Sequence, residues 1–234
     1  MTTEIVADYI VVGAGSAGCV LANRLSADPV NRVLLLEGGG DDRPLHNLKQ
    51  FWSNLLIHTP IGFGKTLNDP KVNWIYQTEP DPGTGGRPHK WRKGKVLGGS
   101  SSINAMLYIR GQAADYDGWA QMGCRGWSYD DVLPYFRRSQ NQERGECDTH
   151  GVGGPLNTCD YSERNEVSQA LLDACDEAGI PRVDDINTGD QEGVTWFQLT
   201  EKGGKRCSTA VAFLHPVMNR ANLRVETEAQ TTRI

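Results

Sequence analysis

The first 37 residues carry the pattern that most restricts how this chain can fold. A short run of apolar and β-branched residues, Asp8 to Gly13, leads directly into the glycine-rich sequence GAGSAG. A stretch with small and apolar residues along one helical stripe follows, and a second apolar run ends at Glu37. Strand, glycine turn, helix and strand in this order predict the β-α-β unit of a Rossmann-like α/β domain with a parallel or mixed sheet.

Each glycine of the G-x-G-x-x-G spacing has its own physical role. Gly13 permits a tight turn, Gly15 allows a pyrophosphate to approach the backbone, and Gly18 lets the helix pack closely on the strand. The helix N-terminus offers unpaired N–H groups and a partial positive charge to the phosphates. Glu37, nineteen residues after Gly18, stands where a carboxylate accepts hydrogen bonds from ribose hydroxyls and repels a 2′-phosphate.

A second glycine-rich segment, GKVLGGSSSINAM at residues 94–106, has two adjacent glycines, three consecutive serines and few bulky side chains. Such a segment fills little of a hydrophobic core by itself. The whole chain is rich in glycine, with 27 in 234 residues, or about 12% against about 7% in an average protein. Glycine is favoured where a ligand approaches the backbone, because it has no Cβ atom. We therefore expect this segment to lie against a ligand.

Charge and composition argue against several classes of partner and site. The formal net charge is −5 without any block of like charges, which argues against nucleic acid as a partner. No apolar run approaches the roughly 18 residues of a membrane span. The N-terminal residues lack the basic start of a signal peptide, so we expect a cytoplasmic protein. The six cysteines contain no C-x-x-C pair, which predicts free thiols and no metal site.

The two glycine-rich motifs together carry a resemblance to a known family. YIVVGAGSAGCVLANRLS near the N-terminus and GKVLGGSSSINAMLYIRG about eighty residues later resemble the glucose–methanol–choline (GMC) oxidoreductases. The resemblance extends over essentially the whole chain and is nearest to choline and aliphatic alcohol dehydrogenases. It implies an FAD-dependent enzyme that oxidises a primary alcohol, choline-like or aliphatic, to an aldehyde by hydride transfer to the flavin.

The same resemblance implies a set of cofactor-binding residues. Trp74 is either an aromatic residue near the cofactor or a core tryptophan, and Thr231, in a predicted final strand, is expected to meet the adenine through its backbone. The other implied contacts are Gly13, Gly15, Ser16, Ala17 and Gly18 at the pyrophosphate, Glu37 and the adjacent Gly38 at the ribose, and Val96, Gly99, Ser100, Ser101, Asn104, Ala105 and Met106 along the flavin.

Two departures from the family pattern bear on the cofactor. Some relatives attach the flavin covalently to a histidine at the position of Ile103. Isoleucine has no nucleophilic nitrogen, so the resemblance implies FAD bound without a covalent link. Lys93 stands where arginine is common, which exchanges a planar fork of donors for a point charge. We expect a looser contact to a phosphate or to a lid there.

The pattern also predicts how the chain is divided. Residues 1–154 are expected to form an FAD-binding domain with irregular lid loops at 40–95. Residues 155–203 are expected to begin an α+β substrate-binding domain, and residues 204–234 to return to the FAD-binding domain. The other predicted elements are helices from Ser128, over 165–178 and from Cys207 to Pro216, and strands at 195–200 and 222–234.

The catalytic base expected from the resemblance is not found in this sequence. GMC enzymes use a histidine near the end of a longer chain, and the five histidines here stand in other contexts, so each is expected on the surface or in a loop. A truncated, inactive form is therefore one interpretation, and an FAD-binding module without catalysis is another. The third interpretation is a nicotinamide dehydrogenase that uses the same glycine motif, but it leaves the segment 94–106 without a role. The exact alcohol, the electron acceptor (oxygen or quinone) and the oligomeric state stay open.

Overall fold

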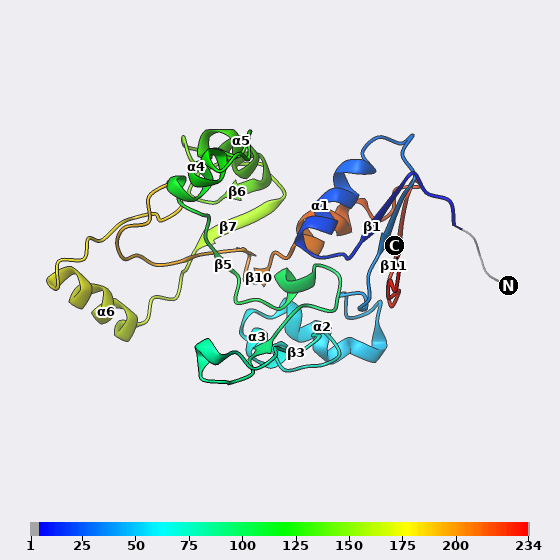
Figure 1. The fold of residues 1–234 in the computed structure, drawn as a ribbon, viewed down its shortest axis with the longest axis horizontal. Helices are drawn as coiled ribbons and strands as arrows, with labels where there is room; N and C mark the ends of the chain where they lie inside the picture. The colour runs from blue at the N-terminus through cyan, green and yellow to red at the C-terminus, as the bar shows by residue number, and fades with distance from the viewer. Residues whose placement is uncertain (1–4, 234) are drawn as a thin grey trace. The chain divides into compact units, whose positions relative to one another are not determined.

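The structure, a computed structural model, describes residues 5–233, which divide into two units (Figure 1). Unit 1 comprises the described residues up to Met106 together with those from Gly203 onward, and unit 2 comprises Leu107–Lys202. The chain is predicted to return to the FAD-binding domain at residue 204, and the observed boundary between unit 2 and unit 1 lies next to it, between Lys202 and Gly203. The predicted domain boundary between residues 154 and 155 falls inside unit 2. The assignment of these parts to FAD binding and substrate binding stays a prediction.

A three-stranded parallel sheet forms the centre of unit 1. β2 (Val33–Leu36) lies between β1 (Tyr9–Val12) and β11 (Leu223–Glu226), and its first residue pairs with the first residue of each neighbour. α1 (Ser16–Leu25) connects β1 to β2 and contacts both strands (Figure 1). The predicted β-α-β unit is confirmed, and unit 1 has the expected Rossmann-like α/β fold.

The last strand is shorter than the sequence predicts. β11 ends at Glu226, and the chain then turns through Glu228, which has a φ of 56°. The amide of Glu228 donates to the carbonyl of Gly39, and the amide of Ala229 donates to the carbonyl of Glu37. These bonds hold the final residues against the loop after β2, so Thr231 lies outside the sheet and the prediction that it stands in a strand is wrong.

Residues 40–95 are less irregular than predicted. They contain two short helices, α2 (Phe51–His58) and α3 (Phe63–Thr66), and neither has a side-chain cap among the described residues. Ile57 is fully buried in an apolar cluster with Val96, and this tertiary burial stabilises a helix that local periodicity and capping do not indicate. The other elements are the 3₁₀ turns η1 (Leu48–Gln50), η2 (Pro60–Gly62) and η3 (Pro82–Thr84) and the antiparallel pair β3 (Tyr76–Gln77) and β4 (Lys90–Trp91).

The segment after residue 204 begins with the short strand β10 (Lys205–Arg206). The helix predicted from Cys207 to Pro216 is instead a π-helical turn, η5 (Ala210–Leu214), followed by a 3₁₀ turn, η6 (His215–Val217). The segment is therefore helical as predicted, but it begins later and its turns are π and 3₁₀ rather than α. Pro216 has no N–H and cannot continue an α-helical ladder. η5 packs against α1 and buries Phe213 and Leu214.

Unit 2 is built on a four-stranded mixed sheet in the order β5-β8-β7-β6. β6 and β7 pair in parallel, whereas β8 is antiparallel to β5 and β7. Because β6 precedes residue 154 and β7 follows it, the two sides of the predicted boundary belong to one sheet. The elements are β5 (Leu107–Tyr108), α4 (Ala113–Gln121), α5 (Tyr129–Ser139), β6 (Gln140–Gln142), β7 (Leu156–Asp160), α6 (Glu166–Glu177), β8 (Gln198–Leu199) and β9 (Glu201–Lys202).

The two helices predicted in unit 2 are confirmed with their N-terminal signals. Ser128 accepts a hydrogen bond from the amide of Asp131, whose carboxylate accepts one from the amide of Ser128. This capping box starts α5 as the sequence predicts. Asn165 caps α6 by accepting from the amides of Val167 and Ser168.

Candidate cofactor-binding site

A cleft of about 470 Å³ opens in unit 1 at the carboxyl ends of β1 and β2. Ligands of open α/β sheets bind outside this edge of the sheet, because the loops there diverge. The cleft is lined by Val12, Gly13, Gly15, Ser16, Leu36, Glu37, Gly38, Trp74, Tyr76, Lys93, Gly94, Gly99, Ser100, Ala229, Gln230 and Thr231. Residues from both glycine-rich motifs therefore share one cavity.

The two motifs are in direct backbone contact. The amide of Gly98 donates to the carbonyl of Ala14 over 2.8 Å. Gly99, which begins the 3₁₀ turn η4 (Gly99–Ser102), has a φ of 53°, and a Cβ atom on it would lie 2.7 Å from the Cα atom of Gly15. The second motif therefore packs on the first at a distance that only glycine permits.

The first motif leaves the N-terminus of α1 open towards the cleft. Gly13 has a φ of 90°, and a Cβ atom on Gly18 would overlap the carbonyl oxygen of Gly13, so both glycines are required by the turn and by helix packing. Among the described residues, no side chain caps α1 and no acidic residue lies in its first turn. A Cβ atom on Gly15 would meet no described atom within 4 Å. Free N–H groups, a positive helix end and open space fit a pyrophosphate.

Glu37 joins the two loops that border the cleft. It is only 6% exposed, and its carboxylate accepts hydrogen bonds from the amides of Ala14 and Gly39, both over 2.8 Å. Burial raises the pKa of Glu37, while the two amide bonds and the charge of Lys95 oppose the rise. A carboxylate has further lone pairs after two such bonds, so Glu37 can still accept a ribose hydroxyl.

One wall of the cleft combines aromatic rings with cationic side chains. Trp74 stacks on Tyr76 with ring centroids 5.9 Å apart and an interplanar angle of 4°. The Nζ atom of Lys95 lies 4.5 Å from the centroid of the Trp74 ring, within range of a cation–π interaction. Lys93, which stands where arginine is common in the family, also lines the cleft. Trp74 is thus a wall residue rather than a buried core tryptophan.

Seven of the predicted contacts lie outside the lining set: Ala17, Gly18, Val96, Ser101, Asn104, Ala105 and Met106. Val96 is fully buried in the apolar cluster with Ile57. The Ser101 hydroxyl donates to the carbonyl of Gly98 over 2.6 Å and accepts from the amide of Thr209. Ala17 and Gly18 belong to α1 and the other five belong to the segment 94–106, and the contacts of all seven to a cofactor stay predictions.

Several lining residues were not predicted. Val12 and Leu36 are the last residues of their strands, so their place at the sheet edge follows from the β-α-β prediction itself. Tyr76 reaches the cleft through its stack on Trp74. Ala229 and Gln230 reach it because the chain turns at Glu228, and no local sequence signal indicates this turn. Gly94 belongs to the second motif but was not singled out.

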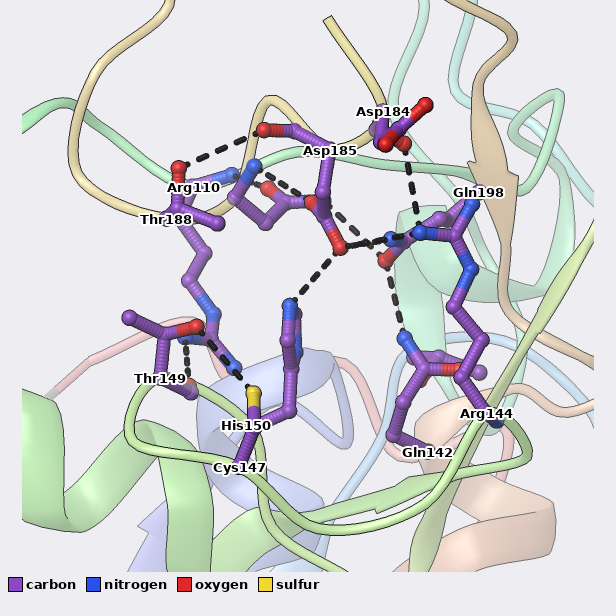
Figure 2. Close-up of polar contacts among 12 residues, drawn as sticks. Arg110, Gln142, Arg144, Cys147, Thr149, His150, Asp184, Asp185, Thr188 and Gln198 are labelled. Carbon is purple, nitrogen blue, oxygen red and sulfur yellow. Dashed lines mark hydrogen bonds and ion pairs between the residues drawn. The ribbon is translucent and has the colours of Figure 1, made fainter.

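A second polar cluster lies in unit 2, centred on His150 and Asp185 (Figure 2). His150 is 3% exposed, with Nε2 2.9 Å from Asp185 Oδ2 and Nδ1 2.9 Å from the Gln140 side-chain oxygen. Gln198 also donates to Asp185, and Arg110 donates to Gln140. Burial opposes ionisation, yet the hydrogen bond from His150 and other donors hold the pKa of Asp185 below its usual value. His150 lies in a loop, one of the two expected places, but it is buried rather than on the surface, and both of its ring nitrogens are engaged.

Two other histidines meet a buried carboxylate in unit 1. Asp42 is fully buried, with Oδ1 2.8 Å from His215 Nε2 and Oδ2 3.4 Å from His58 Nε2. The Nε2 atom of His58 also lies 3.0 Å from the Asp42 carbonyl oxygen. These contacts join the loop after β2 to α2 and η6. No histidine among the described residues lines the cleft.

The described part of the chain shows neither a metal site nor a membrane-spanning helix. Residues 5–233 contain no cluster of three or more His, Cys, Asp or Glu side chains arranged to hold a metal ion. Within the same residues, no helix combines the length and apolar character needed to cross a bilayer. All six cysteines are free, and burial raises the pKa of Cys19 to about 11, so its thiol is protonated at neutral pH.

Comparison with known proteins decides the family. A family model for GMC oxidoreductases matches residues 7–234. The chain belongs to the GMC oxidoreductase family. Mitochondrial choline dehydrogenase of Mus musculus is 47% identical over 226 residues, and alcohol dehydrogenase [acceptor] of Pseudomonas putida is 45% identical over 228 residues. Each alignment covers 97% of this chain, but only 37% and 40% of the respective relative.

Solved structures of GMC-like enzymes agree with the fold of this chain. Pyridoxine 4-oxidase from Mesorbium loti superposes with a TM-score of 0.86 at 35% identity, covering 95% of this chain and 42% of that protein. Formate oxidase of Aspergillus oryzae gives a TM-score of 0.82 at 28% identity, covering 97% and 39%. The chain therefore spans about two fifths of these proteins, and the comparisons support FAD as its cofactor. The mouse relative is named as mitochondrial, so the expected cytoplasmic location stays a prediction.

Proposed function

We propose that this GMC chain binds FAD without a covalent link in the cleft of unit 1. The observation that carries the proposal is the junction of the two glycine-rich motifs, where the amide of Gly98 donates to the carbonyl of Ala14 and the neighbouring Gly15 and Gly99 line the cleft. A dinucleotide with a flat ring system needs both an anion-binding helix end and a surface free of large side chains. In this cleft the two requirements are met by adjacent segments.

The lining residues support specific roles. The pyrophosphate would lie at the start of α1, near Gly15 and Ser16, and the ribose near Glu37. The flavin would lie along Gly99 and the residues that follow it. Thr231 and its neighbours border the remaining side of the cleft, where the adenine would lie. When bound, FAD supplies the acceptor for a hydride; the chain itself binds and orients this group.

Non-covalent attachment is supported by the surroundings of Ile103. This side chain is buried in the apolar cluster with Ile57 and Val96 and carries no nucleophile. Among the described residues that line the cleft, no histidine or cysteine is available to form a bond to the flavin. Denaturation of the loaded chain is therefore expected to release all of its FAD into solution.

We infer further that the whole protein oxidises a primary alcohol, choline-like or aliphatic, to an aldehyde. The relatives at 45–47% identity named choline dehydrogenase and alcohol dehydrogenase support this substrate class. Such a reaction would move a hydride from the carbinol carbon to the flavin and the hydroxyl proton to a base. An electron acceptor, oxygen or a quinone, would then remove the two electrons.

Gly15 allows a sharp test of the cleft. A Cβ atom on Gly15 would point into open space and its φ of −74° suits any residue, so Gly15→Val should fold normally while its side chain occupies the ligand space. Gly64→Val is the matched control, because a Cβ atom on Gly64 also meets no described atom within 4 Å and this residue lies in α3. FAD titration followed by flavin fluorescence should show saturable binding to the unchanged chain and Gly64→Val, and none to Gly15→Val. Equal binding by all three would contradict the proposed site.

An FAD-binding module without catalysis is the second candidate function. It is favoured by one observation: no histidine among the described residues lines the cleft, so the described lining does not supply the histidine base that the resemblance implies. Anaerobic addition of choline or a primary aliphatic alcohol to the loaded chain distinguishes the two functions. Bleaching of the flavin absorbance supports alcohol oxidation by this chain, whereas bound flavin that stays oxidised supports the binding module. Preference for NAD over FAD in the titration would instead support a nicotinamide dehydrogenase.

A further inference from the structure

Arg206 is a buried cation in unit 1 without a carboxylate partner. Its residue is 2% exposed, and it takes part in no ion pair among residues 5–233. Its Nε donates to the carbonyl of Ile57 over 2.8 Å, and its Nη1 donates to the carbonyl of Ser101 over 3.1 Å and to the side-chain oxygen of Asn104 over 2.7 Å. Its Nη2 has no hydrogen-bond partner in the described chain.

This arrangement is costly if Arg206 serves packing alone. Removing a charge from water is unfavourable, and here no opposite charge offsets that cost. Burial lowers the pKa of Arg206 to about 10, so the guanidinium still carries its positive charge at neutral pH. A neutral amide side chain could satisfy carbonyl groups without this penalty. The retained charge therefore points to a role beyond hydrogen bonding.

The partners of Arg206 show where its charge acts. Ser101 and Asn104 belong to the second glycine-rich motif, and Ile57 belongs to α2. The oxygen of Asn104 also accepts from the amide of Met106 over 3.0 Å, so the orientation of this side chain is fixed. With its oxygen turned towards these two donors, Asn104 turns its amide group away from Arg206. The guanidinium thus contacts the segment that the proposed function assigns to the flavin.

We propose that Arg206 positions the segment 101–104 and that its charge raises the reduction potential of the bound flavin. The inference rests on the proposed FAD site. A flavin gains negative charge when it accepts a hydride, and a positive charge fixed in a low-dielectric environment favours the reduced state. Arg206 does not need to touch the flavin for this effect, because the interaction between charges acts over a distance when little water screens it. It is therefore a positioning residue rather than a catalytic one.

The two parts of the role predict different behaviour for two variants of the 234-residue chain. Arg206→Lys keeps the charge but loses the fork of donors, so FAD affinity should fall on the order of tenfold while the midpoint potential changes little. Arg206→Met removes both, so affinity should fall and the potential should become more negative. Potentials are measured by anaerobic spectroscopic titration against reference dyes, and affinity by flavin fluorescence.

Arg110→Met is the matched control. Arg110 is likewise buried and donates to Tyr108, Thr149 and Gln140, but it belongs to unit 2 and none of these partners lines the cleft. Its loss should destabilise unit 2 and leave the flavin potential and FAD affinity unchanged. A shift in potential that is equal in Arg110→Met and Arg206→Met would overturn a specific role for Arg206.

Other outcomes separate this inference from the proposed function. If the unchanged chain binds no FAD, the FAD site itself is refuted. If it binds FAD and Arg206→Met keeps the original potential, only the role of the charge is refuted. Arg206→Gln, which is neutral but retains an amide donor, replaces Arg206→Met if the latter lacks the far-ultraviolet circular dichroism of a folded chain. Failure of both neutral variants to fold would reduce Arg206 to a structural residue and overturn the inference.

Discussion

The amide of Gly98 donates a hydrogen bond to the carbonyl of Ala14 over 2.8 Å, although the two residues belong to motifs far apart in the sequence. Ala14 is also held from the other side, because its own amide donates to the carboxylate of Glu37. The turn after β1 is therefore fixed between β2 and the second glycine-rich segment. Formation of the cleft depends on tertiary contacts, so loss of either contact should affect both stability and cofactor binding.

Gly99→Ala should destabilise the chain and weaken FAD binding. The added Cβ atom would lie 2.7 Å from the Cα atom of Gly15, and the φ of 53° at Gly99 disfavours any side chain. We expect a loss of about 2–3 kcal/mol in the free energy of unfolding, measured by urea titration. Gly86→Ala separates the two causes, because Gly86 has a φ of 70° but open space around its Cβ position. Similar losses in both variants would mean that backbone strain, not the collision, dominates.

The stability of unit 1 should depend on pH through Asp42 and His58. The hydrogen bond to Asp42 raises the pKa of His58 above 6.5, although burial of the imidazole opposes this rise. At Asp42, burial favours a higher pKa, but the hydrogen bonds from His215 and His58 outweigh it, so the pKa of this carboxyl group is lowered. The contribution of His58 is complete below pH 6.5 and is lost as the pH rises through its raised pKa. The contribution of Asp42 is present above 3.8 and is lost as the pH falls through its lowered pKa.

Asp42→Asn tests this pH dependence. The variant should lose about 2 kcal/mol of stability at pH 6 and show a flatter profile between pH 6 and 8, measured by thermal unfolding. Asp69→Asn is a suitable control, because Asp69 bonds to Ser53 but contacts no histidine. An unchanged profile in Asp42→Asn would refute the assignment.

His150→Ala should destabilise unit 2 without changing FAD affinity. The substitution removes one buried hydrogen-bond partner from Gln140 and one from Asp185, which costs about 3 kcal/mol although Arg110 and Gln198 still donate to them. Hydrogen exchange should then rise selectively at β6, β7 and β8, whereas flavin titration should give the original dissociation constant. A large loss of affinity would show that the cluster in unit 2 serves the cofactor site after all.

The features that the sequence predicted are those encoded over short distances. Gly13, Gly18 and Glu37 act within one β-α-β unit, so their spacing alone indicates their roles. Burial of His150 was missed because its partners Gln140 and Asp185 come from other segments and only the sheet of unit 2 brings them together. Gln230 was missed for a similar reason, since it reaches the cleft only through the turn at Glu228. Neither contact leaves a periodic or motif-like signal.

Trp74 offers an optical test of the wall that it forms. Because Trp74 lines the cleft and stacks on Tyr76, binding of FAD should quench its fluorescence strongly. Trp74→Phe should therefore lose most of the FAD-dependent quenching, with a modest fall in affinity from the smaller ring. Trp52→Phe is the matched control, because Trp52 lies on α2, is 74% exposed and does not line the cleft. If quenching falls equally in the two variants, the cofactor does not lie beside Trp74, and the proposed orientation of FAD in the cleft is wrong.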